Sequence, residues 1–304
     1  MARFDLDSEM LAFIDKYVEV SQMSTAVSIE QQRSDYEAMV QHFRYAYPAD
    51  ISSRDDSIEG RHGAVPLRHY RRGDGDDRAL ILFVHGGGFI LGSLDSHDDI
   101  CAELCARTGL DLVSVDYRLS PEFYHPAHLD DVEDAFNALA HDNTILVGAS
   151  AGGTLCAALC HRIGTSPQKP AGQVLIYPGL GGERFDLESY RVNADAPLLT
   201  SNDIRFYRGT RCPGDELPLD DPEFYPLLAD DFSNIPATIA ISADIDPLRD
   251  DTRLYVEKLQ ADGVRAEWIN EAGMVHDYLR ARHVSKAAAV AFARIADSIQ
   301  RLAD

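Results

Sequence analysis

The sequence predicts an α/β fold with a mostly parallel central sheet flanked by helices. From residue 79 onward, short apolar runs bounded by Gly and Pro alternate with amphipathic helical segments, a pattern typical of a parallel sheet covered on both faces. The run 143–153, Asn-Thr-Ile-Leu-Val-Gly-Ala-Ser-Ala-Gly-Gly, passes from an apolar strand through Gly-x-Ser-x-Gly into a helical pattern, as a sharp strand-to-helix turn does. With 304 residues, 45% of them hydrophobic, the chain can bury the core of one large domain.

Two amphipathic helices are predicted before the first strands. Residues 8–22 and 29–47 each place apolar side chains on one helical face, and Pro48 ends the second helix. These faces either pack on the main core or roof a pocket. Residues 65–71 then alternate as an antiparallel edge strand would, and residues 73–77 form a polar turn.

The alternating part of the chain follows. Strands are predicted at 79–84, 110–115, 145–147, 172–177, 237–242 and 265–270, and helices at 96–107, 129–140, 151–163, 249–261 and 285–301. Regularity lapses between residues 179 and 234, where Gly, Pro and Asp are frequent and only 201–209 has a helical pattern. This segment is the natural place for an insertion over the carboxyl ends of the strands, where open α/β sheets bind ligands.

Three strand ends carry the residue types that acyl transfer by serine requires. Ser150, Asp246 and His276 follow separate predicted strands, in the order nucleophile, acid and histidine that α/β-hydrolases have. The histidine accepts the hydroxyl proton and the carboxylate orients the ring. Three glycines at 86–88, also after a strand, let backbone amides approach a substrate oxygen with no Cβ in the way.

Alternatives exist for the acid. Asp244 stays open as a second candidate, whereas Asp250 and Asp251 begin a predicted helix, where carboxylates are favourable without any catalytic duty. Among the histidines, His85 directly precedes the glycines. We interpret it as a residue that braces the glycine loop through hydrogen bonds, because His276 has the better position for a base.

The sequence resembles the hormone-sensitive-lipase-like family of bacterial carboxylesterases over about residues 65–300. The shared segments are His-Gly-Gly-Gly-Phe at 85–89, Asp-Tyr-Arg-Leu-Ser-Pro-Glu at 116–122, Gly-Ala-Ser-Ala-Gly-Gly at 148–153, Asp-Pro-Leu-Arg-Asp at 246–250 and Gly-Met-Val-His at 273–276. The resemblance implies an α/β-hydrolase fold with a small helical cap. Its implied parts are N-terminal cap helices at 1–50, a catalytic domain at 51–180 and 232–304, and a cap insertion at 181–231.

The same resemblance implies a serine carboxylesterase that acts on short-acyl esters. The oxyanion hole would be formed by the backbone N–H groups of Gly87, Gly88 and Ala151, and no cofactor takes part. An amidase or formamidase using the same triad is an alternative. A hydrolase-fold receptor without catalysis is a further one, which the presence of His276 disfavours.

Two positions depart from the family pattern. Ala149 stands where most relatives carry Asp or Thr, and Asp277 and Tyr278 follow the histidine where many relatives have Gly-Phe. A carboxylate at 277 could stabilise the imidazolium or select against anionic substrates. The simpler interpretation, which we adopt, is a side chain turned into solvent.

The composition of the chain limits the kinds of molecule that it is expected to bind. The formal charge of −22 disfavours nucleic acid and anionic membranes and favours a small neutral ester or a cationic ligand. The amino terminus lacks the apolar core of a secretory signal, and no run approaches the length of a membrane span. Five cysteines without zinc-site spacing indicate reduced thiols and no metal. We therefore expect a cytoplasmic protein, and a homo-oligomer is left open.

Overall fold

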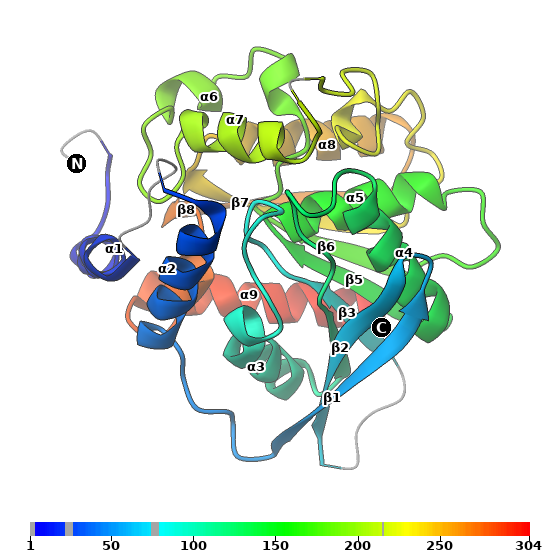
Figure 1. Cartoon of the computed structure of the whole chain (residues 1–304), viewed down its shortest axis with the longest axis horizontal. Coiled ribbons are helices and arrows are strands. Elements are labelled where there is room, and N and C mark those ends of the chain that lie inside the picture. The colour runs from blue at the N-terminus through cyan, green and yellow to red at the C-terminus, as the bar shows by residue number, and fades with distance from the viewer. Residues whose placement is uncertain (1–3, 22–26, 74–78, 215) are drawn as a thin grey trace.

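The computed structural model describes residues 4–21, 27–73, 79–214 and 216–304. Their strands are β1 (Ile51–Gly60), β2 (Gly63–Arg72), β3 (Leu80–Val84), β4 (Asp111–Val115), β5 (Thr144–Ala149), β6 (Gly172–Ile176), β7 (Ala237–Ile245) and β8 (Ala266–Val275). They form one sheet in the order β1-β2-β4-β3-β5-β6-β7-β8 (Figure 1). β3 to β8 run parallel, whereas β2 pairs antiparallel with both β1 and β4.

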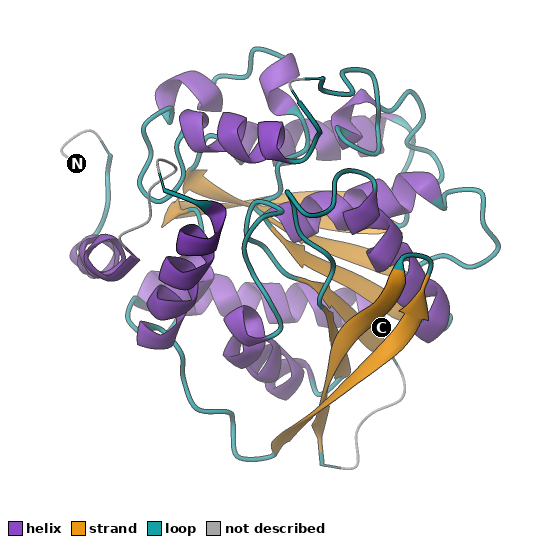
Figure 2. Cartoon of the chain, viewed as in Figure 1, coloured by secondary structure: helices purple, strands orange, loops and turns teal. Residues whose placement is uncertain are grey.

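Helices cover both faces of this sheet (Figure 2). The helices of the described residues are α1 (Ser8–Ser21), α2 (Ile29–His42), α3 (Asp98–Thr108), α4 (Ala127–Leu139), α5 (Ala151–Arg162), α6 (Ser189–Val192), α7 (Ser201–Thr210), α8 (Arg249–Ala261) and α9 (Lys286–Ala303). Alternate side chains of β3 point to opposite faces of the sheet and belong to two separate parts of the core. Ile81 and Phe83 are buried with α3 and α9, whereas Leu82 and Val84 are buried with α4, α5 and α8.

The first strands differ from the prediction in two ways. β1 has no counterpart among the predicted strands, and β2 is not an edge strand, because β1 pairs along its outer side. β1 reads Ile-Ser-Ser-Arg-Asp-Asp-Ser-Ile-Glu-Gly and is mostly exposed, so it shows no apolar alternation that a sequence could reveal. Of the turn predicted at 73–77, all but Gly73 lies outside the described residues, as does residue 22 at the end of the first predicted helix.

The second helix ends earlier than predicted, at His42 rather than before Pro48. The segment after it is bonded to the first turn of α3 instead. Asp99 accepts a hydrogen bond from the Tyr45 backbone N–H at 3.1 Å, and Asp98 accepts one from the Tyr47 hydroxyl. A local apolar pattern does not reveal such long-range contacts.

Candidate active site

Ser150 lies on a strained turn between β5 and α5. Its backbone has φ +52° and ψ −119°, a conformation that is uncommon for a residue with a side chain and that occurs at functional turns. The chain reverses so tightly that a Cβ at Gly152 would lie 2.0 Å from the carbonyl oxygen of Val84. Only glycine fits there, which explains the second glycine of the Gly-x-Ser-x-Gly segment.

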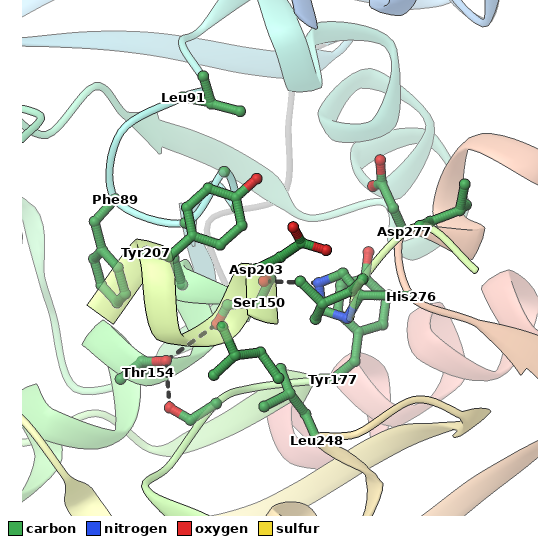
Figure 3. Close-up of a pocket in the computed structure, with 18 of the residues that line it drawn as sticks. Phe89, Leu91, Ser150, Thr154, Tyr177, Asp203, Tyr207, Leu248, His276 and Asp277 are labelled. Atoms are coloured by element: carbon green, nitrogen blue, oxygen red, sulfur yellow. Dashed lines mark hydrogen bonds between the residues drawn. The ribbon is translucent and has the colours of Figure 1, made fainter. Parts of the chain in front are cut away.

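The structure brings Ser150, His276 and Asp246 into one hydrogen-bonded line (Figure 3 shows the serine and the histidine). The Ser150 Oγ lies 2.9 Å from His276 Nε2, and His276 Nδ1 lies 2.6 Å from Asp246 Oδ2. Asp246 directly follows β7, and His276 directly follows β8, so parallel neighbours deliver both side chains to the edge where β5 ends. Asp246 is fully buried, and its Oδ1 accepts a hydrogen bond from the Leu248 N–H at 2.9 Å.

The rival carboxylates are engaged elsewhere. Asp244 accepts a hydrogen bond from the Asn270 side-chain amide at 2.8 Å and makes no contact with His276. Asp250 accepts one from the Ser189 N–H at 3.0 Å, and Asp251 accepts two, from Leu180 and Gly182. Asp250 and Asp251, in the first turn of α8, therefore hold the segment after β6 in place. Of the four candidate carboxylates, only Asp246 orients the histidine.

The predicted oxyanion-hole residues border the same cavity as Ser150. Gly87, Gly88 and Ala151 all line it. Ala151 begins α5, so its N–H belongs to the first helical turn, where amides have no intrahelical acceptor. Within the described part of the chain, neither glycine amide donates a hydrogen bond. The three N–H groups are therefore available to a substrate oxygen near the serine.

His85 braces the glycine loop, in agreement with its predicted role. Its Nδ1 lies 2.8 Å from the Gly86 carbonyl oxygen, and its ring stacks on Tyr117 at 4.3 Å between centroids. Tyr117 in turn donates its hydroxyl hydrogen to the His85 carbonyl at 3.0 Å. Burial lowers the pKa of His85 to about 4, so the ring is neutral near pH 7 and Nδ1 carries the hydrogen that Gly86 accepts.

The interpretation of Asp277 as a solvent-facing side chain was wrong. Its carboxylate accepts hydrogen bonds from the Tyr17 hydroxyl at 3.2 Å and from Arg280 Nε at 2.9 Å. Arg280 is 1% exposed and also donates to the Tyr36 hydroxyl at 2.7 Å. The loop that carries His276 is thus bonded to both amino-terminal helices, α1 through Tyr17 and α2 through Tyr36. The family pattern could not reveal the contacts with Tyr17 and Tyr36, because these tyrosines lie more than two hundred residues away in sequence.

Ser150 and His276 open into a cavity of about 650 Å³. Its walls come from the glycine loop, from α1 and α2, and from α7 and the segment around it. Figure 3 shows Phe89 and Asp277 on opposite sides of the serine, with Tyr207 of α7 facing the same space. The sequence did not single out Tyr207, Arg208 or Arg211 as lining residues. The only signal was the unusual density of aromatic and arginine residues at 206–211 in an otherwise irregular segment.

One cluster in the described residues has the donor set of a metal site. His125, Asp221 and Glu223 each place a possible ligand atom within 4.8 Å of the others. The protein already engages these groups, because His125 Nε2 lies 3.0 Å from Asp221, and Arg162 binds both oxygens of Glu223. An arginine on the carboxylate competes with a cation, and we assign no metal to this cluster.

A strained serine followed by a helix, in line with a histidine and a carboxylate from later strands of a mostly parallel sheet, defines the α/β-hydrolase class. Comparison with known families agrees. The model of the family described as alpha/beta hydrolase fold matches residues 81–280. The chain belongs to this alpha/beta hydrolase family, and the resemblance to hormone-sensitive-lipase-like esterases is confirmed.

Similarity to proteins named as ester hydrolases extends over most of the chain. It is 33% identical over 245 residues to the carboxylic ester hydrolase LipN of Mycobacterium tuberculosis, a match that covers 75% of this chain and 65% of that protein. It is 31% identical over 267 residues to the ethyl acetate hydrolase of Pseudomonas putida, covering 81% and 82%. A solved hyperthermophilic esterase from the archaeon Pyrobaculum calidifontis superposes with a TM-score of 0.88 at 29% identity and 99% coverage of both chains.

Among the described residues, none of the helices combines enough length with enough apolar character to cross a bilayer.

Proposed function

We propose that this protein is a serine carboxylesterase that hydrolyses short-acyl esters through an acyl-enzyme intermediate. The observation that carries the proposal is the continuous hydrogen-bonded line from Ser150 Oγ through His276 to Asp246, with separations of 2.9 and 2.6 Å. These separations suit proton transfer from the hydroxyl to the imidazole. The printed names of the relatives, carboxylic ester hydrolase and ethyl acetate hydrolase, support ester bonds as the target.

In the proposed reaction, Ser150 attacks the ester carbonyl while His276 Nε2 accepts its proton. Asp246 holds the ring and stabilises the imidazolium that forms. The negative charge on the carbonyl oxygen is stabilised by N–H groups of Gly87, Gly88 and Ala151, and one such donor contributes about 3 kcal/mol in well-studied cases. His276 then protonates the leaving alcohol. In the second half of the reaction it activates a water that hydrolyses the acyl-enzyme.

The position of Tyr207 supports the proposal that the acyl group of the substrate is short. A Cβ on Gly88 would lie 2.5 Å from the Tyr207 ring, so this ring rests directly on the glycine loop beside the proposed oxyanion hole. We assign residues 1–50 and 181–231 to a cap over the catalytic domain of 51–180 and 232–304. Support comes from Tyr17 of α1, Tyr36 of α2 and Tyr207 of α7, which line the same cavity as the serine.

We further propose that small neutral esters are substrates and that the protein is cytoplasmic. The formal charge of −22 supports the first point, because it disfavours the approach of anions over long distances. The five cysteines are buried and free, which suits a reducing compartment. Cell fractionation with an antibody against the native protein tests the location.

The function is tested with Ser150→Ala. We expect hydrolysis of p-nitrophenyl acetate to fall by at least about a thousandfold while the circular dichroism spectrum stays unchanged. The control is Ser233→Ala, since Ser233 is an exposed serine away from the cavity. Retained activity in a folded Ser150→Ala protein defeats the proposal. Comparing p-nitrophenyl acetate with p-nitroacetanilide separates an esterase from an amidase, and we expect turnover of the ester only.

A further inference from the structure

Arg211 is a buried cation in the wall of the catalytic cavity. The residue is 3% exposed and lines the cavity together with Ser150. Its guanidinium lies between two aromatic rings, 3.7 Å from the ring centroid of Phe89 and 4.0 Å from that of Phe224. Among the residues that the structure describes, no carboxylate forms an ion pair with it. Burial lowers its pKa to about 10, which leaves it protonated near pH 7.

The stacking leaves one edge of Arg211 unused. The two rings occupy the faces of the planar guanidinium, and Nη1 donates to the Phe224 carbonyl oxygen at 3.4 Å. Nε and Nη2 have no hydrogen-bond partner within the described chain. These two nitrogens point their hydrogens along the same edge, which is the geometry that pairs side-on with both oxygens of a carboxylate. A buried donor without a partner destabilises the fold, and a charged one more so.

Two further residues of the cavity wall hold buried donors. The Tyr225 hydroxyl and Arg208 Nε are buried without a partner in the described residues, and both residues line the cavity. Arg208 pairs through Nη1 with Glu183 at 2.7 Å, so this carboxylate of the cavity wall has a cationic partner. Within the described residues Arg211 itself forms no such ion pair, and Asp221 acts on it only from a longer distance.

The remaining carboxylates of the cavity wall are occupied. Asp203 caps α7 by accepting hydrogen bonds from Thr200, and Asp277 pairs with Arg280. Asp277 lies on the opposite side of Ser150 from Phe89, against which Arg211 stacks (Figure 3). The cavity is therefore polarised, with a cation at the Phe89 end and engaged carboxylates elsewhere.

We infer that the Phe89 end of the cavity is a carboxylate subsite for an ester that carries a free carboxylate besides the ester bond. The carboxylate would accept two hydrogen bonds from Nε and Nη2 of Arg211 and a third from the Tyr225 hydroxyl. This inference rests on the proposed esterase function and deepens it. Neutral esters are hydrolysed, and esters with a suitably placed carboxylate are preferred over neutral ones of the same shape.

The test compares isosteric ester pairs that differ only in charge. Monoethyl succinate against ethyl succinamate places the carboxylate on the acyl side, and acetoxyacetate against acetoxyacetamide places it on the alcohol side. We expect the wild-type protein to prefer the anion by at least about tenfold in kcat/KM in one of the two pairs, mainly through KM. The ester pair that shows the preference identifies whether the acyl side or the alcohol side of the ester faces Arg211.

Substitutions connect this preference to Arg211. In Arg211→Met the ratio of anionic to neutral ester is expected to fall to about one, and Arg211→Lys keeps the charge but loses the planar edge, so it recovers only part of the ratio. The matched control is Arg205→Met, which removes an exposed arginine from α7, the helix that ends just before Arg211, and keeps the wild-type ratio. A ratio near one in both wild-type pairs, or a preference that survives in a folded Arg211→Met protein, overturns the subsite.

A measurement on the unmodified protein covers the case in which Arg211→Met does not fold. Succinate is expected to inhibit p-nitrophenyl acetate hydrolysis at a concentration at least about tenfold lower than succinamide does. Equal inhibition overturns the subsite while hydrolysis itself upholds the esterase. Absence of hydrolysis of every ester, neutral or anionic, instead defeats the proposed function.

Discussion

Replacing Asp246 by Asn tests how the carboxylate controls His276. Asp246 Oδ1 accepts from the Leu248 N–H at 2.9 Å, and Oδ2 faces His276 Nδ1 at 2.6 Å. Leu248 can only donate, so an asparagine keeps its carbonyl oxygen there and turns its NH₂ group toward Nδ1. Nδ1 must then accept, which places the ring hydrogen on Nε2. In this tautomer Nε2 cannot accept the proton of Ser150.

The expected loss follows from two contributions. An asparagine that flips to restore the productive tautomer gives up the hydrogen bond to Leu248, which costs about 1–3 kcal/mol and leaves the productive tautomer roughly 5- to 150-fold less populated. The neutral amide also stabilises the imidazolium less than the carboxylate does, by about 1.5–3 kcal/mol, or roughly 10- to 150-fold. Together they predict a decrease in kcat on the order of 10² to 10⁴.

The matched control is Asp244→Asn. Asp244 accepts from the Asn270 amide at 2.8 Å and does not contact the histidine, so we expect kcat to stay within about tenfold of the wild-type value. Both variants are assayed by steady-state hydrolysis of p-nitrophenyl acetate, with thermal melts followed by circular dichroism. A kcat for Asp246→Asn above about a tenth of the wild-type value would refute the reasoning, as would a larger loss for Asp244→Asn.

Three further predictions concern stability and specificity. Arg280→Met leaves the Asp277 carboxylate without its buried partner, so the free energy of unfolding measured with urea should fall by about 3–5 kcal/mol, whereas exposed Lys286→Met should change it by less than about 0.5 kcal/mol. An equal decrease in the free energy of unfolding for Arg280→Met and Lys286→Met contradicts a stabilising pair between Arg280 and Asp277. Burial lowers the pKa of His161 to about 4, below its unfolded value of about 6.5, so its contribution to stability falls as pH decreases from about 7 toward 4, because only the unfolded chain takes up the proton. The free energy of unfolding, measured with urea, should therefore fall less between about pH 7 and about pH 5 in His161→Gln than in the wild-type protein, by about 2 kcal/mol. An equal fall in the two proteins contradicts the lowered pKa of His161. Tyr207→Ala should raise kcat/KM for p-nitrophenyl octanoate relative to the acetate by at least about tenfold, and an unchanged ratio shows that this ring does not limit the acyl chain.

The predictable parts of this molecule are those whose cause is local. β3, β5 and β6 are buried on both faces and therefore appear as continuous apolar runs with clear ends. Because parallel strands end at one edge, the residues after β5, β7 and β8 could be predicted to converge. The residue after each of these strands is Ser150, Asp246 and His276, respectively.

The parts that escaped prediction depend on partners that the residues themselves do not indicate. β1 is a polar strand that exists because β2 supplies its hydrogen bonds. Asp277 is not at the surface because Arg280 and the hydroxyl of Tyr17 enclose it. The strand has no apolar alternation, and the hydroxyl of Tyr17 lies 260 residues from the carboxylate, so periodicity and composition indicate the wrong environment for both.

The net charge of the protein and the local charge of Arg211 act on an anionic ester at different distances. The formal charge of −22 acts over the whole surface, where salt screens it beyond about 10 Å at 0.1 M ionic strength. Inside the cavity, one guanidinium held between Phe89 and Phe224 acts at hydrogen-bonding distance in a medium of low dielectric constant. The acidic surface therefore lowers the encounter rate for anionic esters, whereas the cavity retains those that enter. Raising the salt concentration should accordingly increase kcat/KM for the anionic ester more than for its neutral isostere, since screening removes the surface repulsion but leaves the buried contact.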